Sequence, residues 1–256
     1  MSVELDSPLV FDAALRKIEA YWAVPMILRN RFEMDLFPIV GTEHDQLVPS
    51  GIDNPYWELI RRLPSRNDGT WQGVTPYGYI RDLDIGRTAL VTTYAWSIPS
   101  PGDISWIASL LDGRAVVEVG AGSGYWAWQL AQAGVDVAPY EPEDLADNTF
   151  VGAAEPYVTL LKDGASAARE HPDRALFMSW PSYGGSWAAH ALSVYQGDLF
   201  IYAGESEGGC CADDPFFHLL GAEWTEVGDS LHHRTWWGIN CRLMAFRRKS
   251  QAEATS

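Results

Sequence analysis

The sequence lacks the features that mark a membrane, secreted or metal-bound protein. No apolar run approaches about 18 residues, and the opening stretch MSVELDSPLV has neither the basic nor the apolar segment of a signal peptide. The three cysteines, Cys210, Cys211 and Cys241, form no CxxC pair. Their odd number suits a reducing compartment and argues against both a disulfide framework and a zinc site. We therefore expect a cytoplasmic protein with no membrane span, no signal peptide and no bound metal.

Positive charge is also scarce. The chain has 18 Lys and Arg against 34 Asp and Glu, which gives a formal net charge of −16, and only the run RRK at 247–249 clusters basic residues. Proteins that bind nucleic acid usually present a basic face, because phosphate contacts supply much of the affinity. The composition therefore disfavours a nucleic-acid partner, and the acidity itself favours solubility.

Aromatic residues are abundant, with 12 Trp and 11 Tyr. Many precede residue 100, where they would suit the wall of a flat or apolar small-molecule pocket. These are Tyr21, Trp22, Tyr56, Trp57, Trp71, Tyr77, Tyr79, Tyr94 and Trp96. Two helices are predicted in this part, one over 7–22 with Pro8 at its first position and one that starts at Asn54 as cap with Pro55 next. We expect residues 1–99 to form a largely helical cap that helps to bind the substrate.

Beyond residue 100 the pattern alternates between strands and helices. Strands are predicted at 115–119, 135–141, 157–161, 175–180 and 198–205, and helices at 103–111, 124–134, 164–171, 186–197 and 213–221. Such alternation indicates βαβ units and a mainly parallel sheet. The last two segments, 223–234 and 239–249, have no helix between them and predict an antiparallel hairpin at a sheet edge. Residues 100–250 are thus predicted to form one α/β domain, followed by a frayed tail at 251–256.

Three glycines at two-residue spacing follow the first of these strands, in VEVGAGSGYW. Glycines after a strand let the backbone approach a ligand, and the helix that follows offers free N–H groups. The dinucleotide fingerprint GxGxxG would need a glycine where Tyr125 stands, and no P-loop Gly-Lys-Ser/Thr follows. This disfavours an NAD-dependent dehydrogenase. Glu118 precedes the glycines, and Glu141 ends the next strand, 21 positions after Gly120, where a ribose-binding acid is expected.

The pattern ExGxGxG, formed by Glu118, Gly120, Gly122 and Gly124, resembles motif I of the class I S-adenosylmethionine-dependent methyltransferases. YAWSIPSP, VEVGAGSGYWAW, FMSWPSYG and GESEGGCCADDPFF also resemble a group of methyltransferase-like proteins of bacteria and fungi. The resemblance implies a Rossmann-like fold with a seven-stranded, mainly parallel sheet in the order 3-2-1-4-5-7-6 and an antiparallel last strand. It also implies S-adenosyl-L-methionine as cofactor, with the motif I acid near its methionine ammonium group.

The resemblance further implies a set of cofactor-binding residues. Asp163, in the loop after the third predicted strand, would accept from the adenine amino group, although it could instead cap the helix from Gly164. Tyr94 and Trp96 belong to a segment that would pass over the cofactor, where they could line the methionine end or the acceptor pocket, or simply pack under a lid. The complete set is Glu118, Gly120, Ala121, Gly122, Gly124, Tyr125, Glu141, Asp163, Ser179, Trp180 and Tyr94.

The end of the fourth strand carries SWPSY, residues 179–183. It is similar to the Asn/Asp/Ser-Pro-Pro-aromatic motif of enzymes that methylate amines of DNA and protein, but it differs at Trp180 and Ser182. A general base is needed only if the acceptor is protonated. The candidates for that role are Glu205, Tyr183 and His233.

Together these features predict methyl transfer from S-adenosylmethionine to a nitrogen or oxygen of a small, aromatic or apolar metabolite, by a monomer or homodimer. Two alternatives stay open. One is a regulatory or partner protein that binds the cofactor without methylating. The other is an amine methyltransferase that acts on nucleic acid or protein through the WPSY segment.

Overall fold

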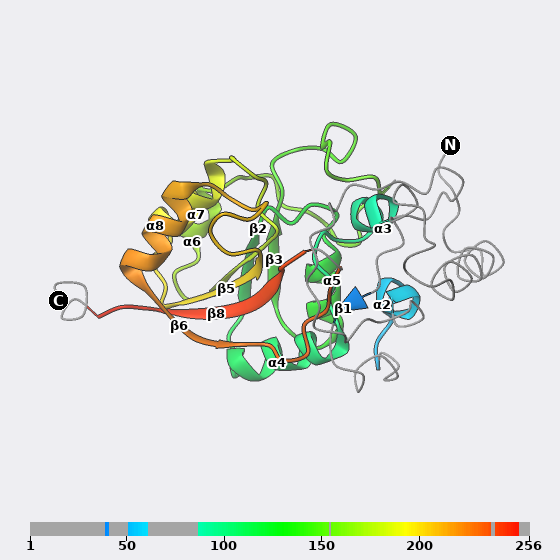
Figure 1. The fold of residues 1–256 in the computed structure, drawn as a ribbon, viewed down its shortest axis with the longest axis horizontal. Coiled ribbons are helices and arrows are strands. Elements are labelled where there is room, and N and C mark those ends of the chain that lie inside the picture. The colour runs from blue at the N-terminus through cyan, green and yellow to red at the C-terminus, as the bar shows by residue number, and fades with distance from the viewer. Residues whose placement is uncertain (1–38, 41–50, 61–86, 154, 237–238, 251–256) are drawn as a thin grey trace, which may run out of the picture.

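A six-stranded sheet forms the centre of the molecule (Figure 1). The computed structural model describes residues 39–40, 51–60, 87–153, 155–236 and 239–250. The strand order is β3-β2-β4-β5-β8-β6, where the first four are parallel and β8 runs antiparallel to both β5 and β6. This is the class I methyltransferase order without its third strand. The bounds are β2 Val116–Val119, β3 Val137–Tyr140, β4 Ala175–Ser179, β5 Leu199–Gly204, β6 Trp224–Asp229 and β8 Arg242–Arg248.

The predicted strand at 157–161 does not form, so this sheet has six strands where seven were expected. Only Leu161 pairs with β3, through an isolated parallel bridge to Tyr140. The segment before it is held elsewhere, because the Tyr157 amide donates to the Ser123 carbonyl at 2.9 Å and Val158 packs against Gly124. These contacts draw the segment across the loop between β2 and α5 and away from the sheet edge.

Helices cover both faces of the sheet (Figure 1). On one face lie α4 Pro101–Leu111 and α5 Tyr125–Gln132, and on the other α6 Ala167–Glu170, α7 Trp187–Val194 and α8 Asp214–Glu223. Side chains alternate along β4, where Leu176 packs toward α6–α8 and Phe177 toward α4 and α5. Burial on both faces explains why these strands read as continuous apolar runs. None of the described helices is long and apolar enough to cross a bilayer.

An aromatic group fills the core between β5, β8 and α8. Phe200 has ring contacts with Phe216, Trp224 and Phe246 at centroid distances of 6.1, 5.9 and 5.9 Å. Helix α8 begins as predicted, because the Asp213 carboxylate accepts from the Phe216 amide at 3.1 Å.

Helix α4 begins two residues before its predicted start at residue 103. Pro101 occupies the first turn, and Ser100 is the N-cap. The Ser100 hydroxyl accepts from the Asp103 amide at 3.0 Å, and the Asp103 carboxylate accepts from the Ser100 amide at 3.3 Å. This reciprocal capping box leaves the second oxygen of Asp103 available for another partner.

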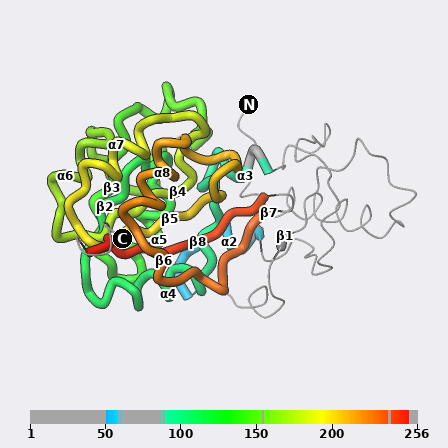
Figure 2. The backbone as a smooth tube through the Cα atoms, turned by 60° about the vertical axis from the view of Figure 1, so that its left-hand side comes forward, coloured from blue at the N-terminus to red at the C-terminus, as the bar shows by residue number. Residues whose placement is uncertain are grey.

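Parts of the N-terminal region are described as well. Helix α2 Pro55–Ile60 begins as predicted, with the Trp57 amide donating to Asn54 at 3.0 Å. Helix α3 Arg87–Thr93 and the small sheet of β1 Ile39–Val40 with β7 Thr235–Trp236 were not predicted (Figure 2). The predicted helix at 7–22, the tail at 251–256 and five of the aromatic residues lie outside the described residues. The five are Tyr21, Trp22, Trp71, Tyr77 and Tyr79.

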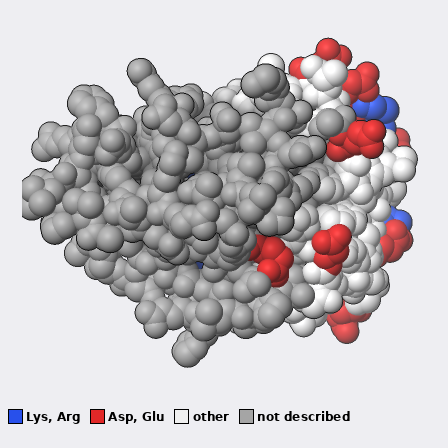
Figure 3. Space-filling model, turned by 90° about the vertical axis from the view of Figure 1, so that its right-hand side faces the viewer, with Lys and Arg blue, Asp and Glu red and all other residues white. Residues whose placement is uncertain are grey.

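Carboxylates are spread over the described surface of the face in Figure 3, with few Lys or Arg side chains among them. This agrees with the excess of acids in the sequence.

Replacing Phe200 by Ala should lower the free energy of unfolding by about 3–5 kcal/mol, because a buried ring at the centre of the aromatic group is removed. Chemical denaturation measures this. Val227→Ala, at a half-exposed position of β6, is the control and should change stability by less than about 1 kcal/mol. Equal losses in the two variants would contradict the assignment of the core.

Candidate functional site

The loop between β2 and α5 lies at the carboxyl edge of the sheet and takes an unusual backbone path. Gly120, Gly122 and Gly124 have φ angles of 73°, 56° and 76°, in the left-handed region that favours glycine. The amides of Gly120 and Ala121 donate to the Tyr140 carbonyl at 2.9 and 3.0 Å. The backbone alone therefore favours glycine at these three positions, and the loop is tied to the end of β3.

Side chains of the chain itself pack against two of these glycines. A Cβ atom on Gly120 would lie 2.5 Å from the Trp187 ring, and one on Gly124 would lie 2.8 Å from Val158. A Cβ atom on Gly122 would meet only Val151, at an ordinary 3.6 Å. Gly120 and Gly124 thus serve internal packing, and Gly122 is the glycine whose amide faces the predicted ribose-binding acid.

That acid, Glu141, directly follows β3 and is buried. Its Oε2 accepts from the Gly122 amide at 2.9 Å, and its Oε1 accepts from the Glu143 amide at 3.3 Å. Burial raises the pKa of Glu141, and the two backbone donors act against this rise. The structure therefore brings the predicted glycine loop and the predicted second acid into direct contact.

Glu118 on β2 is buried and incompletely satisfied. Its Oε2 has no hydrogen-bond partner within the described part of the chain. Burial raises the pKa of Glu118 to about 8, and the negative charge of Glu141 acts in the same direction. A buried carboxyl oxygen without a donor is costly. A cation beside it would favour the ionised form, so the site suits an ammonium group.

The segment at 92–97 crosses the glycine loop. The Gly152 amide donates to the Thr92 carbonyl at 2.7 Å, and the Ser123 hydroxyl donates to the Tyr94 carbonyl. The rings of Tyr94 and Tyr125 are buried in an aromatic cluster beneath α2, and the Tyr125 hydroxyl donates to Asn54 at 2.7 Å. Both residues thus lie next to the loop, with their rings packed in the core.

Asp163 closes the turn before α6. Its Oδ1 accepts from the Gly164 amide at 2.6 Å and from the Ser166 hydroxyl at 2.8 Å. The capping alternative is wrong, because α6 begins at Ala167 and its N-cap is Ser166, so these contacts hold only the turn before the helix. The proposed adenine contact of Asp163 stays a prediction.

The end of β4 shapes a neighbouring part of the same edge. The Ser179 hydroxyl lies 2.8 Å from that of Ser97, and the Trp180 ring stacks on Trp96 with centroids 6.2 Å apart. Trp180 has a φ of 51°, which is uncommon for a bulky residue.

The rest of the WPSY segment is bound to the loop after β5. The Pro181 carbonyl accepts from the Ala212 amide at 2.9 Å, and Tyr183 is 77% exposed. In the amine-methylating motif, carbonyls of this turn would accept from the target amine. Here the Pro181 carbonyl is already used within the chain.

Glu205 follows β5, is buried, and has both oxygens occupied. Oε1 accepts from the Asn240 amide and Oε2 from the Cys210 amide, each at 2.7 Å. Glu205 thereby joins the loop after β5 to the chain that enters β8. Both oxygens are therefore engaged by backbone amides of the chain itself.

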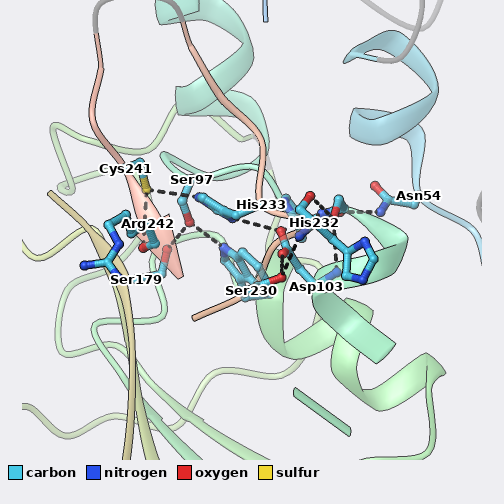
Figure 4. A network of polar contacts seen from close by, with 12 residues as sticks. Asn54, Ser97, Asp103, Ser179, Ser230, His232, His233, Cys241 and Arg242 are labelled. Carbon is cyan, nitrogen blue, oxygen red and sulfur yellow. Dashed lines mark hydrogen bonds and ion pairs between the residues drawn. The ribbon is translucent and has the colours of Figure 1, made fainter. Parts of the chain in front are cut away.

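His233 lies in a chain of buried polar contacts (Figure 4). Its Nδ1 is 2.8 Å from Asp103 Oδ2, and its Nε2 is 3.2 Å from Cys241 Sγ. Asp103 also accepts from the Ser230 hydroxyl at 2.6 Å. Because an ionised carboxylate only accepts, Nδ1 donates to Asp103, and the contact of Nε2 with Cys241 Sγ continues the chain of polar contacts.

Burial raises the pKa of Cys241 well above its usual value, so the thiol is neutral. His233 therefore faces a thiol of its own chain and not an open surface. Within the described residues no group of His, Cys, Asp and Glu is placed to hold a metal ion. The contact between Asp103 and His233 joins residues 130 positions apart, and nothing in the local sequence indicates it.

Sequence reasoning also missed Arg87, at the start of α3. Its guanidinium carbon lies 5.5 Å from the Trp96 ring centroid and 5.7 Å from that of Trp180. It therefore lies against both rings of the stacked pair. Because α3 was not predicted, the sequence offered no reason to connect Arg87 with the end of β4.

No family model and no curated protein matches the chain. Among solved structures it is similar to the magnesium protoporphyrin IX methyltransferase of Synechocystis with bound S-adenosylmethionine, with 13% identity and a TM-score of 0.38 over 57% of this chain and 76% of that one. It is also similar to the 1,6-didemethyltoxoflavin-N1-methyltransferase of Burkholderia thailandensis, with 18% identity and a TM-score of 0.36 over 59% and 77%. A putative RNA methyltransferase of Pyrococcus horikoshii shares 14% identity, with a TM-score of 0.37 over 59% and 85%.

Asp103→Ala should lower the free energy of unfolding by about 3–5 kcal/mol, because it leaves His233, Ser230 and the Ser100 amide without their acceptor. Denaturant titration measures the loss. Asp173→Ala, at an exposed position, removes the same charge and should stay within about 0.5 kcal/mol of the parent protein. A similar stability for both variants would show that the Asp103 contacts do not support the fold.

Proposed function

We propose that the protein is an S-adenosylmethionine-dependent methyltransferase that acts on a small molecule. The arrangement of Glu118 and Glu141 around the glycine loop carries this proposal. Glu141 contacts the Gly122 amide, and Glu118, on the adjacent strand, has a buried oxygen without a donor among the described residues. Two acids placed in this way suit a ligand that brings both a cation and hydroxyl groups.

The residues present fit the cofactor. Glu118 would hold the ammonium group of its methionine part, and Glu141 would accept from its ribose hydroxyls while the Gly122 amide stays nearby. When bound, S-adenosylmethionine would supply a methyl group on a sulfonium; transfer would form a bond from the acceptor atom to the methyl carbon, break the methyl–sulfur bond in line and release S-adenosylhomocysteine. The protein contributes mainly the orientation of the acceptor.

The described candidate bases are poorly placed to take a proton from an acceptor. The oxygens of Glu205 bind backbone amides, Tyr183 is exposed, and His233 faces the Cys241 thiol. We therefore favour an acceptor whose nucleophilic atom carries a free electron pair at neutral pH and needs no enzymatic base.

A small aromatic acceptor agrees best with the surroundings. The Trp96 and Trp180 rings stand at the end of β4, the strand beside β2 and its glycine loop. Such rings favour a planar apolar partner. The acidic surface in Figure 3 gives little attraction for phosphates.

Glu141→Ala should weaken the binding of S-adenosylhomocysteine by about tenfold to a hundredfold, since hydrogen bonds to a charged acceptor contribute about 1.5–3 kcal/mol. Isothermal titration calorimetry measures this, and Glu143→Ala is the control because the hydrogen bond from Glu143 to Glu141 comes from its backbone amide, which the variant keeps. Absence of binding to the parent protein would refute the cofactor assignment. Parent-like affinity in Glu141→Ala would remove Glu141 from the site.

Catalysis needs a separate measurement. Incubation with S-adenosylmethionine and a panel of aromatic metabolites should produce a methylated product detectable by mass spectrometry. Cofactor binding without any product would favour the regulatory alternative. Binding to DNA or RNA that weakens with salt would favour the nucleic-acid alternative.

Glu118→Gln should stabilise the protein at pH 8 and abolish tight binding of S-adenosylhomocysteine. The pKa of Glu118 in the folded state, about 8, lies above its usual value of 4.5. The stabilising contribution of the Glu118 carboxyl group is therefore complete only below about pH 4.5 and is lost as the pH rises through 8.

The free energy of unfolding of Glu118→Gln should exceed that of the parent by about 2–4 kcal/mol at pH 8 and by almost nothing at pH 5, as measured by denaturant titration. In the parent protein, affinity for S-adenosylhomocysteine should rise from pH 6 to pH 8, as ligand binding releases the Glu118 proton. Glu143→Gln, an exposed acid nearby, should reproduce neither effect. A parent-like stability difference between pH 5 and pH 8 in Glu118→Gln would contradict the interpretation.

A further inference from the structure

Arg87 is a mostly buried cation whose surroundings in the described structure are aromatic. Its guanidinium lies against the rings of Trp96 and Trp180, and its buried Nε has no acceptor among the described residues. No carboxylate of this part of the chain forms an ion pair with it. A buried N–H group without an acceptor is unfavourable, and partial burial lowers the pKa of Arg87.

The acid whose charge acts on Arg87 does not supply the missing acceptor. Glu205 is close enough for its charge to favour the protonated form of Arg87, but both Glu205 oxygens already bind the amides of Cys210 and Asn240. The N–H groups of the guanidinium form a planar fork that matches the two oxygens of a carboxylate. Arg87 thus offers donors that an incoming anion can use.

The aromatic pair beside Arg87 is held in place by the backbone. Trp180 adopts a left-handed φ of 51°, and its amide donates to the Ala203 carbonyl at 2.7 Å. A left-handed backbone is unfavourable for an L-residue. It orients the Trp180 ring nearly parallel to Trp96, with an angle of 25° between the planes. Phe150, half exposed, meets Trp96 edge-on and extends the aromatic surface outward.

We propose that Arg87 binds the carboxylate of the acceptor substrate and that Trp96 and Trp180 contact its planar ring. The acceptor class is then an aromatic carboxylic acid. That the bound acid is the methyl acceptor rests on the proposed methyltransferase function. The anion site at Arg87 does not depend on that function. Trp180 directly follows β4, the strand beside β2, so a ligand on Arg87 would lie beside the glycine loop.

The test uses 2-naphthoate as probe and the neutral 2-naphthamide as its isostere, titrated into the full chain by calorimetry. We expect 2-naphthoate to bind at least about tenfold more tightly than the amide, since a bidentate charged contact is lost in the latter. Equal affinity for the two, or no binding of either, would overturn the proposal. Tighter binding of 2-naphthyl phosphate than of 2-naphthoate would overturn the carboxylate class.

Variants separate Arg87 from the general charge of the protein. Arg87→Gln should remove the preference for the acid, and Arg87→Lys should retain part of it, because lysine keeps the charge without the fork. Arg169→Gln, at an exposed position of α6, is the matched control and should bind 2-naphthoate like the parent. An unchanged preference in Arg87→Gln would overturn the proposal.

Binding of S-adenosylhomocysteine is measured on the same samples. Arg87→Gln should keep it, which shows that the variant is folded. If Arg87→Gln does not fold, Arg87→Lys tests the proposal instead. Its preference for 2-naphthoate over 2-naphthamide should be smaller than that of the parent but still measurable. If the parent binds 2-naphthoate through Arg87 but does not bind S-adenosylhomocysteine, the anion site stands and the methyltransferase function fails.

Discussion

The hydrogen bond from the Gly122 amide to the Glu141 carboxylate is the contact on which the candidate site depends. It joins the loop after β2 to the end of β3, and the neighbouring amides of Gly120 and Ala121 donate to the Tyr140 carbonyl. Parallel pairing of β2 with β3 brings these two strand ends to the same edge. The left-handed glycines then turn the amide of Gly122 toward the acid.

Buried carboxylates that accept backbone amides recur through the molecule. Glu205 binds two amides between the loop after β5 and the start of β8, and Asp103 binds one at the start of α4 while it also holds His233. Each stabilises a junction between segments far apart in the chain. Glu118 differs, because one of its oxygens is buried without a donor in the described structure. Its raised pKa marks a position where the fold gives up stability, as functional sites often do.

The aromatic residues divide into two groups with different surroundings. Tyr94 and Tyr125 pack into the cluster beneath α2, where they support the glycine loop from within. Trp96 and Trp180 meet at the end of β4 and flank the guanidinium of Arg87. The first group is structural, whereas the second combines a planar apolar surface with an unused cation. That combination is why the acceptor is assigned to the end of β4.

The sequence by itself determined the alternation of strands and helices, the closing hairpin and the spacing of Glu118, the glycines and Glu141. These features are local, because strand and helix periodicity and the conformational freedom of glycine act over a few residues. The predicted strand at 157–161 failed because Tyr157 binds Ser123 in the glycine loop, a competing contact that no local pattern contains.

Only the tertiary structure decided which side chains meet. It placed His233 between Asp103 and Cys241, satisfied both oxygens of Glu205, and set Arg87 against Trp96. Each of these meetings joins segments brought together by the strand order and by the packing of α3 and α4. Such contacts depend on the path of the whole chain, so residue type and spacing along the sequence do not specify them.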